Sequence, residues 1–398
     1  MKAIQDAYLV AATRTPVGKR MGTLRNVRPD DMLAHVLAAV VRKVPDMDPA
    51  EIGDVICGCA MPEAEQGMNV ARIGLLLAGL PESVPGITIN RFCSSGLNAV
   101  ADAAARIMLG QCDIAIGAGT ESMSVMPTMT GNKTSLNPAV FEKDENHGIA
   151  YGMGITAETV AHRFAVSRED QDAFALQSHR KAVAAIQAGK FRDEITAYPV
   201  RERLPDFKTG QVRLVERIVD TDEGPRADSS IEGLAKLRPA FAAKGSVTAG
   251  NSSQMSDGAA AVLLMSEAAL KRTGAVPIAR FLSFAVAGVP PEVMGMGPVA
   301  AIPLACKQAA VDLGDVDWIE LNEAFAAQAL AVMRQMALDP ARVNPLGGAI
   351  ALGHPLGATG AIRTATVLAA MQRGEARLGM VSMCIGTGMG AAGLFAKV

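Results

Sequence analysis

Residues 86–119 read GITINRFCSSGLNAVADAAARIMLGQCDIAIGAG, and this stretch decides the fold. Its first apolar run, 86–90, predicts a short strand. Apolar residues then recur at spacings of three and four, which predicts a helix that ends at Gly110. A second apolar run, 113–119, predicts another strand that enters a glycine turn. The residues on the apolar face of the helix are Leu97, Val100, Ala101, Ala104, Ile107 and Met108.

The same alternation of strand and helix extends toward the N-terminus. Residues 54–57 predict a buried strand, and residues 69–80 predict a helix. Strands that alternate with helices form a mostly parallel sheet with helices on its faces, so we expect an α/β fold.

The C-terminal third repeats this order of elements. Its pattern resembles the first part in type of element and not in residue identity, and it predicts two similar halves packed together. The alternative is that this rhythm is common to all α/β proteins. The corresponding segments are a strand at 316–321, a helix at 322–336, a strand position at 343–344, a helix at 358–371 and a strand at 379–384.

The segment between the two halves has a different amino-acid composition. From Glu121 to Val247, Met, Pro, Asn and charged residues increase and strand-like runs become rare. Ser167 and Asp170 resemble a capping box that opens a helix, so we expect a largely helical insertion. The predicted division is an N-terminal half at 1–120 plus 248–270, an insertion at 121–247, and a C-terminal half at 271–398.

Composition excludes several classes of protein. The 398 residues are 49% hydrophobic and carry 38 Lys plus Arg against 40 Asp plus Glu, a net charge of −2, which gives no general attraction to nucleic acid or anionic membranes. No run approaches the roughly 18 apolar residues that span a bilayer. Six cysteines without an export signal favour reduced thiols and a cytoplasmic location. Gly is unusually frequent at 39 residues, and aromatics make up only 4%.

Cys93 is the first candidate for chemistry. It lies between a predicted strand and the start of a predicted helix, with small residues after it. A helix N-terminus favours the thiolate, so we expect a lowered pKa and a nucleophilic thiol. The alternative is a buried structural cysteine.

His354 and Cys384 are two further candidates, each in a glycine-rich stretch. Five glycines occur in the 14 residues from Gly347 to Gly360, so the chain there turns tightly around His354, a possible general base or oxyanion donor. Cys384 precedes a second glycine turn, whose N–H groups can form an oxyanion hole. The alternatives are a structural histidine and a nucleotide-binding loop, although no P-loop lysine follows.

Asn322 starts the predicted helix 322–336, where it serves as an N-cap or orients a water or a carbonyl group. We expect no metal site, because Cys57 and Cys59 have no partner ligands at zinc spacing.

Four of these segments together resemble the thiolase family over essentially the full chain: 90–96, 322–325, 353–355 and 384–390. The resemblance implies a duplicated, five-layered αβαβα core with a loop domain that binds coenzyme A (CoA). It implies a homodimer or homotetramer, acyl-CoA substrates, CoA as co-substrate and no permanently bound cofactor. The implied reaction is thiolytic cleavage of 3-ketoacyl-CoA, or the reverse condensation, through an acylated cysteine.

The resemblance also implies residue roles. Cys93 would be the nucleophile, His354 its base, and Cys384 the group that moves the α-proton of acetyl-CoA. Asn322 would hold a water that completes one oxyanion hole with His354, and the backbone N–H groups of Cys93 and Gly386 would form the second. The implied CoA-binding residues are Met153, Arg226, Ala249, Ser253 and Phe325.

Two positions depart from the biosynthetic members that the chain resembles. Gly152 replaces His and Gly233 replaces Ser, which favours a broad-range 3-ketoacyl-CoA enzyme over a strict acetoacetyl-CoA thiolase. A ketoacyl synthase is a second alternative. Those enzymes use two histidines beside the nucleophilic cysteine, whereas the third group here is Cys384. The third alternative is a silent CoA- or lipid-binding protein of the same fold, which would lack the reactive residues.

Overall fold

The computed structural model describes residues 4–126 and 136–398. The first three residues of the predicted N-terminal half, and residues 127–135 of the predicted insertion, therefore lie outside the described residues. No helix in the described ranges is long and apolar enough to cross a membrane.

The N-terminal half is built on five strands in the order β4-β3-β5-β8-β1. β3 runs parallel to β4 and β5, whereas β8 is antiparallel to β5 and β1. The bounds are β1 (Tyr8–Arg14), β3 (Asp54–Gly58), β4 (Gly86–Ile89), β5 (Ile114–Ser122) and β8 (Ser256–Met265), and the short β2 (Gly18–Lys19) pairs with β8.

The C-terminal half repeats this topology. Its strands are β9 (Ala279–Gly288), β10 (Trp318–Leu321), β11 (Leu378–Ile385) and β12 (Met389–Lys397), in the order β10-β11-β12-β9 with the same parallel and antiparallel pairs. The strand expected at 343–344 is reduced to one parallel bridge between Ile319 and Val343. The predicted duplication is confirmed, since β3, β5, β8 and β1 of one half correspond to β10, β11, β12 and β9 of the other.

The two half-sheets meet at β1 and β9. Antiparallel pairs Tyr8–Arg280 and Leu9–Ala279 join them into one ten-stranded sheet. This pairing is short, so most of the contact between the halves comes from α3 and α11, the helices that lie between the two half-sheets.

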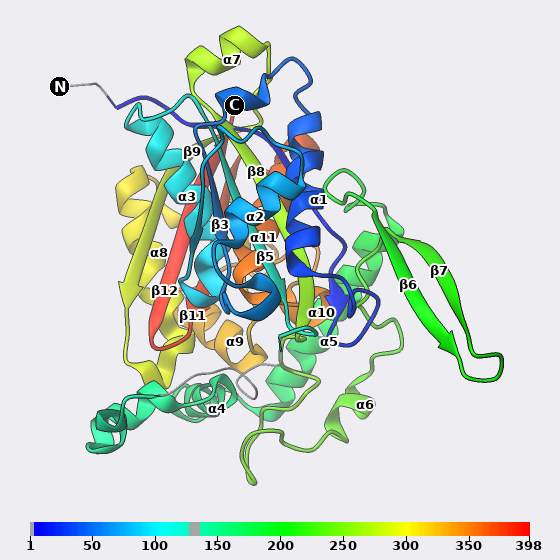
Figure 1. The fold of residues 1–398 in the computed structure, drawn as a ribbon. Coiled ribbons are helices and arrows are strands. Elements are labelled where there is room, and N and C mark those ends of the chain that lie inside the picture. Colours follow the sequence, from blue (N-terminus) through cyan, green and yellow to red (C-terminus); the bar gives the residue numbers. More distant parts are fainter. Residues whose placement is uncertain (1–3, 127–135) are drawn as a thin grey trace.

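Helices and sheets form the predicted five layers (Figure 1). α1 (Pro29–Arg42) and α2 (Val70–Leu77) cover the outer face of the N-terminal sheet, and α8 (Gly297–Ala309) and α9 (Ala326–Gln335) cover that of the C-terminal sheet. α3 (Ser95–Met108) and α11 (Leu356–Gln372) lie between the sheets, where a third apolar cluster contains residues of both halves.

Glycines set the distance between the two central helices. A Cβ at Gly96 of α3 would lie 2.7 Å from the carbonyl oxygen of Gly357, and one at Gly360 of α11 would lie 2.6 Å from Cβ of Leu97. Since real Cβ atoms do not approach so closely, larger side chains would push α3 and α11 apart.

The insertion between β5 and β8 contains helices, as expected, and also a hairpin that the sequence did not predict. Its helices are α4 (Met153–Arg163), α5 (Arg168–Gln187), with Ser167 as N-cap, and α6 (Ile231–Ala235). The hairpin consists of β6 (Tyr198–Asp206) and β7 (Gln211–Val219) and projects from the body (Figure 1). It escaped prediction because most of β7 is exposed and carries no alternation of buried and exposed residues. The remaining short helices are α7 (Glu267–Thr273) and α10 (Ala349–Leu352).

Candidate active site

Three segments converge where the two halves meet. The 3-10 turn Phe92–Ser94 carries Cys93 and packs against both α11 and β11. His354 lies two residues before α11 starts, and Cys93 lies two residues before α3 starts, so the two side chains occupy equivalent places in the two halves. Cys384 is the last but one residue of β11.

Cys93 is a partly buried, protonated thiol. Burial is the largest influence on its pKa and raises it to about 11, although the backbone N–H groups of Gly386 and Cys93 itself favour the thiolate. The lowered pKa that we expected from the helix N-terminus is therefore wrong, because the cost of desolvating the thiolate outweighs the N–H groups around it.

Cys384 lies next to Cys93 and is fully buried. Burial raises the pKa of its thiol well above the usual range, and the neighbouring Cys93 raises it further. Both cysteines are consequently protonated at neutral pH. The Cys384 thiol therefore holds a proton that it can give to a strong base.

His354 is held from both sides of its ring. Nδ1 lies 2.7 Å from Oγ1 of Thr359, and Nε2 lies 3.3 Å from Nδ2 of Asn322. Burial, aided by the charge of Arg363, lowers the pKa of His354 to about 3, so the resting imidazole is neutral. When Nδ1 donates to Thr359, Nε2 carries the lone pair, which accepts from Nδ2 of Asn322 at rest and can take a proton instead.

Asn322 does not cap a helix. α9 begins four residues later than expected, at Ala326, with Phe325 as its N-cap residue. Asn322 instead continues the end of β10, where its N–H donates to the carbonyl of Ser382 at 2.9 Å. Its Oδ1 is buried without a hydrogen-bond partner in the described chain, so Asn322 has an acceptor to offer beside His354.

Three of the five expected CoA-binding residues lie near the reactive groups. Met153, the first residue of α4, and Phe325 share an apolar cluster with Cys384. The backbone N–H of Ser253 donates to Ala324 at 2.9 Å, beside Phe325. The other two, Arg226 and Ala249, are exposed.

Comparison with known proteins identifies the family. The model described as "Thiolase, N-terminal domain" matches residues 7–268, and "Thiolase, C-terminal domain" matches residues 275–397. The chain belongs to the thiolase family.

Relatives and solved structures match this thiolase over nearly its whole length. A 3-ketoacyl-CoA thiolase of Bacillus subtilis (strain 168) is 50% identical over 98% of this chain and 99% of its own length. The peroxisomal 3-ketoacyl-CoA thiolase 1 of Arabidopsis thaliana is 48% identical over 98% of this chain and 88% of its own. The crystal structure of the Bacillus anthracis acetyl-CoA acetyltransferase, 38% identical, superposes with a TM-score of 0.89 and covers 100% of both chains.

Several residues that orient the site were missed from sequence. Thr359 lies in the same glycine-rich run as His354, and this proximity was an available clue. Gln254 is harder to find from the sequence, because it contacts the glycine-rich run around His354 only in the folded chain. Its carbonyl accepts from the His354 N–H at 3.1 Å, and its Nε2 donates to the carbonyls of Ile350 and Ala351.

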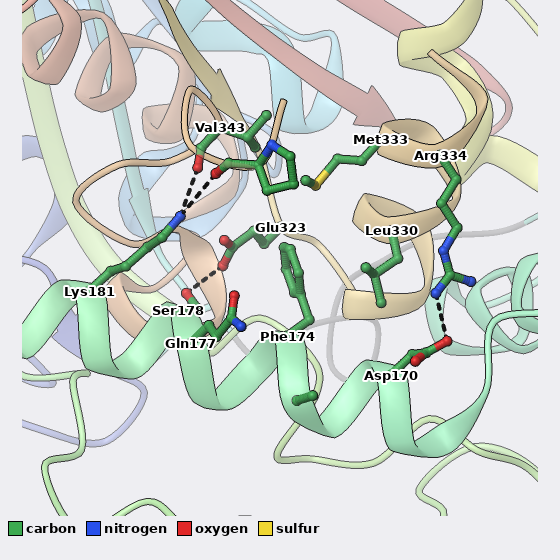
Figure 2. Close-up of a pocket in the computed structure, with 12 residues that line it drawn as sticks. Asp170, Phe174, Gln177, Ser178, Lys181, Glu323, Leu330, Met333, Arg334 and Val343 are labelled. Atoms are coloured by element: carbon green, nitrogen blue, oxygen red, sulfur yellow. Dashed lines mark hydrogen bonds and ion pairs between the residues drawn. The ribbon is translucent and has the colours of Figure 1, made fainter. Parts of the chain in front are cut away.

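A separate cavity of about 240 Å³ lies in this thiolase between α5 and α9 (Figure 2). Ser178 donates to the buried Glu323 at 2.6 Å, and Lys181 reaches the carbonyl of Val343 at 3.0 Å. Each of these polar groups thus has a hydrogen-bond partner within the cavity wall, and none of them belongs to the turn that carries Cys93. The cavity is therefore distinct from the candidate active site, although Glu323 follows Asn322 directly.

Alkylation of Cys93 tests the protonation state of this thiolase. With a pKa near 11, the iodoacetamide rate at Cys93 should rise about tenfold per pH unit from pH 7 to pH 10, with no plateau, because only the thiolate reacts. Mass spectrometry of the Cys93 peptide measures the rate, with glutathione as the reference thiol. A plateau below pH 8.5 would show that the helix N-terminus dominates after all.

Proposed function

We propose that this thiolase cleaves 3-ketoacyl-CoA with CoA thiol, releasing acetyl-CoA and an acyl-CoA shortened by two carbons, and that it also runs the reverse condensation. The observation that carries the proposal is the pair of protonated thiols, Cys93 and Cys384, beside a neutral buried His354. One thiol to bear the acyl group and another to move a proton are what carbon–carbon cleavage needs.

In the first half-reaction, His354 takes the proton of Cys93 as the sulfur attacks the 3-keto carbon. The bond between carbons 2 and 3 then breaks, and its electron pair forms the enolate of acetyl-CoA. Cys384 protonates this enolate, and the acyl group stays on Cys93 as a thioester. The high pKa of Cys384 suits this step, since the resting thiol carries the needed proton.

In the second half-reaction, CoA thiol gives its proton to the Cys384 thiolate and attacks the acyl carbon. The tetrahedral intermediate collapses, and Cys93 leaves with the proton held by His354. Both thiols and the imidazole thereby return to their starting states, so the cycle is ping-pong and consumes no cofactor.

Two oxyanion holes serve the two intermediates. The backbone N–H groups of Cys93 and Gly386, which lie against the Cys93 sulfur, would stabilise the tetrahedral oxyanion. The protonated Nε2 of His354 and a water bound to Asn322 would stabilise the enolate. The unpartnered Oδ1 of Asn322 supports such a water, since a buried carbonyl oxygen gains by accepting a hydrogen bond.

CoA would enter along the insertion. Met153, Ser253 and Phe325 would line the pantetheine arm, with Ala249 farther out and Arg226 at the adenine or phosphate end. The exposure of Arg226 and Ala249 fits contact with the outer part of a long substrate. We retain as proposals the division 1–120 plus 248–270, 121–247 and 271–398, and a cytoplasmic location, which the six free thiols favour.

Substrate range depends on Gly152, the N-cap of α4. A Cβ there would meet no atom within 4 Å, so the missing side chain leaves space beside Met153. Gly233 is less informative, because it is exposed and a Cβ there would contact only Oγ of Ser230. The open space at Gly152 supports the broad-range enzyme over a strict acetoacetyl-CoA thiolase.

Single-turnover labelling tests the mechanism. Mixing with labelled acyl-CoA should place the label on Cys93 in the wild type and, more slowly, in Cys384→Ala, but Cys384→Ala should lose exchange of the α-protons of acetyl-CoA by at least a hundredfold. Mass spectrometry and deuterium exchange measure the two steps, with Cys93→Ala as the unlabelled control. An unlabelled Cys93 in the wild type would refute the covalent mechanism.

A substrate-length series tests the range. The wild type should cleave a ten-carbon 3-ketoacyl-CoA at least as efficiently as acetoacetyl-CoA in terms of kcat/KM. Gly152→His should lower the ten-carbon value about tenfold and change the four-carbon value little, because the imidazole fills space needed by the longer chain. Strong wild-type preference for four carbons would favour the strict acetoacetyl-CoA thiolase.

A homodimer is proposed from the edge strand β4, which ends the sheet with no further strand among the described residues. Ile87 on β4 and Leu77 on α2 are exposed there, at 42% and 58%. Two copies that pair through an unprotected edge bury the same patch twice, as two-fold symmetry requires. Light scattering should find a dimer or a tetramer made of two dimers, converted to monomer by Ile87→Lys but not by Val276→Lys, which is exposed elsewhere. A monomeric wild type would exclude this contact.

A further inference from the structure

Glu121 is a fully buried carboxylate surrounded by hydrogen-bond donors. It lies at the end of β5 and accepts from the N–H groups of Ala60 at 2.7 Å, Gly357 at 2.9 Å and Met61 at 3.3 Å. The amide of Gln66 also donates to it, and the Cys59 sulfur lies 3.8 Å away. Burial raises the pKa of Glu121 above its usual value, and the donors oppose this rise, because an ionised carboxylate only accepts hydrogen bonds.

These donors come from both halves of the molecule. Ala60, Met61 and Gln66 belong to the loop after β3, in the N-terminal half, whereas Gly357 lies in the first turn of α11, in the C-terminal half. Gly357 follows His354 by three residues. Glu121 thus connects the N-terminus of α11, the helix that follows His354, to the N-terminal half.

Glu121 also has a structural counterpart in the site. It is the last but one residue of β5, as Cys384 is of β11, and β5 and β11 occupy the same place in their half-sheets. Each side chain reaches across to the other half: Cys384 to the turn before α3, and Glu121 to the start of α11.

We propose that Glu121 is a positioning residue of the thiolase reaction, which fixes His354 through the N-terminus of α11. This inference rests on the proposed function.

Geometry carries this proposal, and charge adds a second readout. A carboxylate at the first turn of α11 is stabilised by the free N–H groups there, and losing it frees the turn to move. The titratable groups that respond to Glu121 are the thiols of Cys57, Cys59 and Cys93, and the carboxylate raises the pKa of all three, although burial raises that of Cys93 more. Removing the charge therefore favours the Cys93 thiolate.

Two substitutions separate the tether from the charge. Glu121→Gln removes the charge and presents an amide N–H₂ to other donors. We expect kcat to fall at least tenfold with KM for CoA within about threefold, and iodoacetamide to modify Cys93 at least threefold faster at pH 8. Glu121→Asp keeps the charge but is shorter by one methylene, so kcat should fall while the alkylation rate stays within about twofold of the wild type.

Asp257→Asn is the matched control. Asp257 is a buried carboxylate on the adjoining strand β8 that accepts hydrogen bonds from Ser122 and Ser124, and within the described part of the chain it makes no hydrogen bond to α11. It should leave the alkylation rate at Cys93 within about twofold of the wild type.

Several outcomes overturn the proposal. One is a Glu121→Gln enzyme with wild-type kcat, and another is one that loses activity through KM for CoA with kcat unchanged. If Glu121→Gln does not fold, Glu121→Asp decides, and a kcat within twofold of the wild type rejects the tether. A wild type that cleaves no 3-ketoacyl-CoA refutes the proposed function instead, and the alkylation rates still test the charge.

Discussion

The whole site depends on the close contact between α3 and α11. These two helices lie side by side between the sheets because Gly96 and Gly360 allow their backbones to approach. Cys93 and His354 each precede one of them by two residues, so the separation of the helices sets the separation of the two reactive groups. A core-packing constraint thereby becomes a catalytic one, and no flexible loop has to find the right place.

Burial gives the site its resting electrostatics. Cys93, Cys384 and His354 are all neutral, because desolvation disfavours the charged form of each. A site with no permanent thiolate resists unproductive alkylation and oxidation. In the proposed mechanism its hydrogen-bond donors face the places where charge develops, an arrangement that lowers the barrier.

The sequence was sufficient for the family and the layered fold, and the comparisons confirm both. Regular spacing in α3 and the strand runs at 54–57 and 113–119 predicted elements that the structure contains, since α3 buries its apolar face and both strands are buried along their whole length. The hairpin β6–β7 was missed, because most of β7 is exposed.

Other errors share one cause, which is that contacts made through space leave no local pattern. Asn is a residue type that often caps helices, yet the side chain of Asn322 pairs with that of His354, which lies 32 residues away in the sequence. The pKa of Cys93 was predicted from its helix alone and is governed by the protein that covers it. The roles of the CoA-binding residues stay predictions.

The equivalent placement of Cys93 and His354 explains why one continuous chain suits this chemistry. A dimer of identical half-sized subunits would bring two copies of one residue to its axis, either two thiols or two imidazoles. Fusing the halves frees each position to differ, so that in the proposed mechanism one half supplies the acyl carrier and the other its proton acceptor. The internal symmetry of the scaffold is broken at these two residues, while the strands and helices around them keep it.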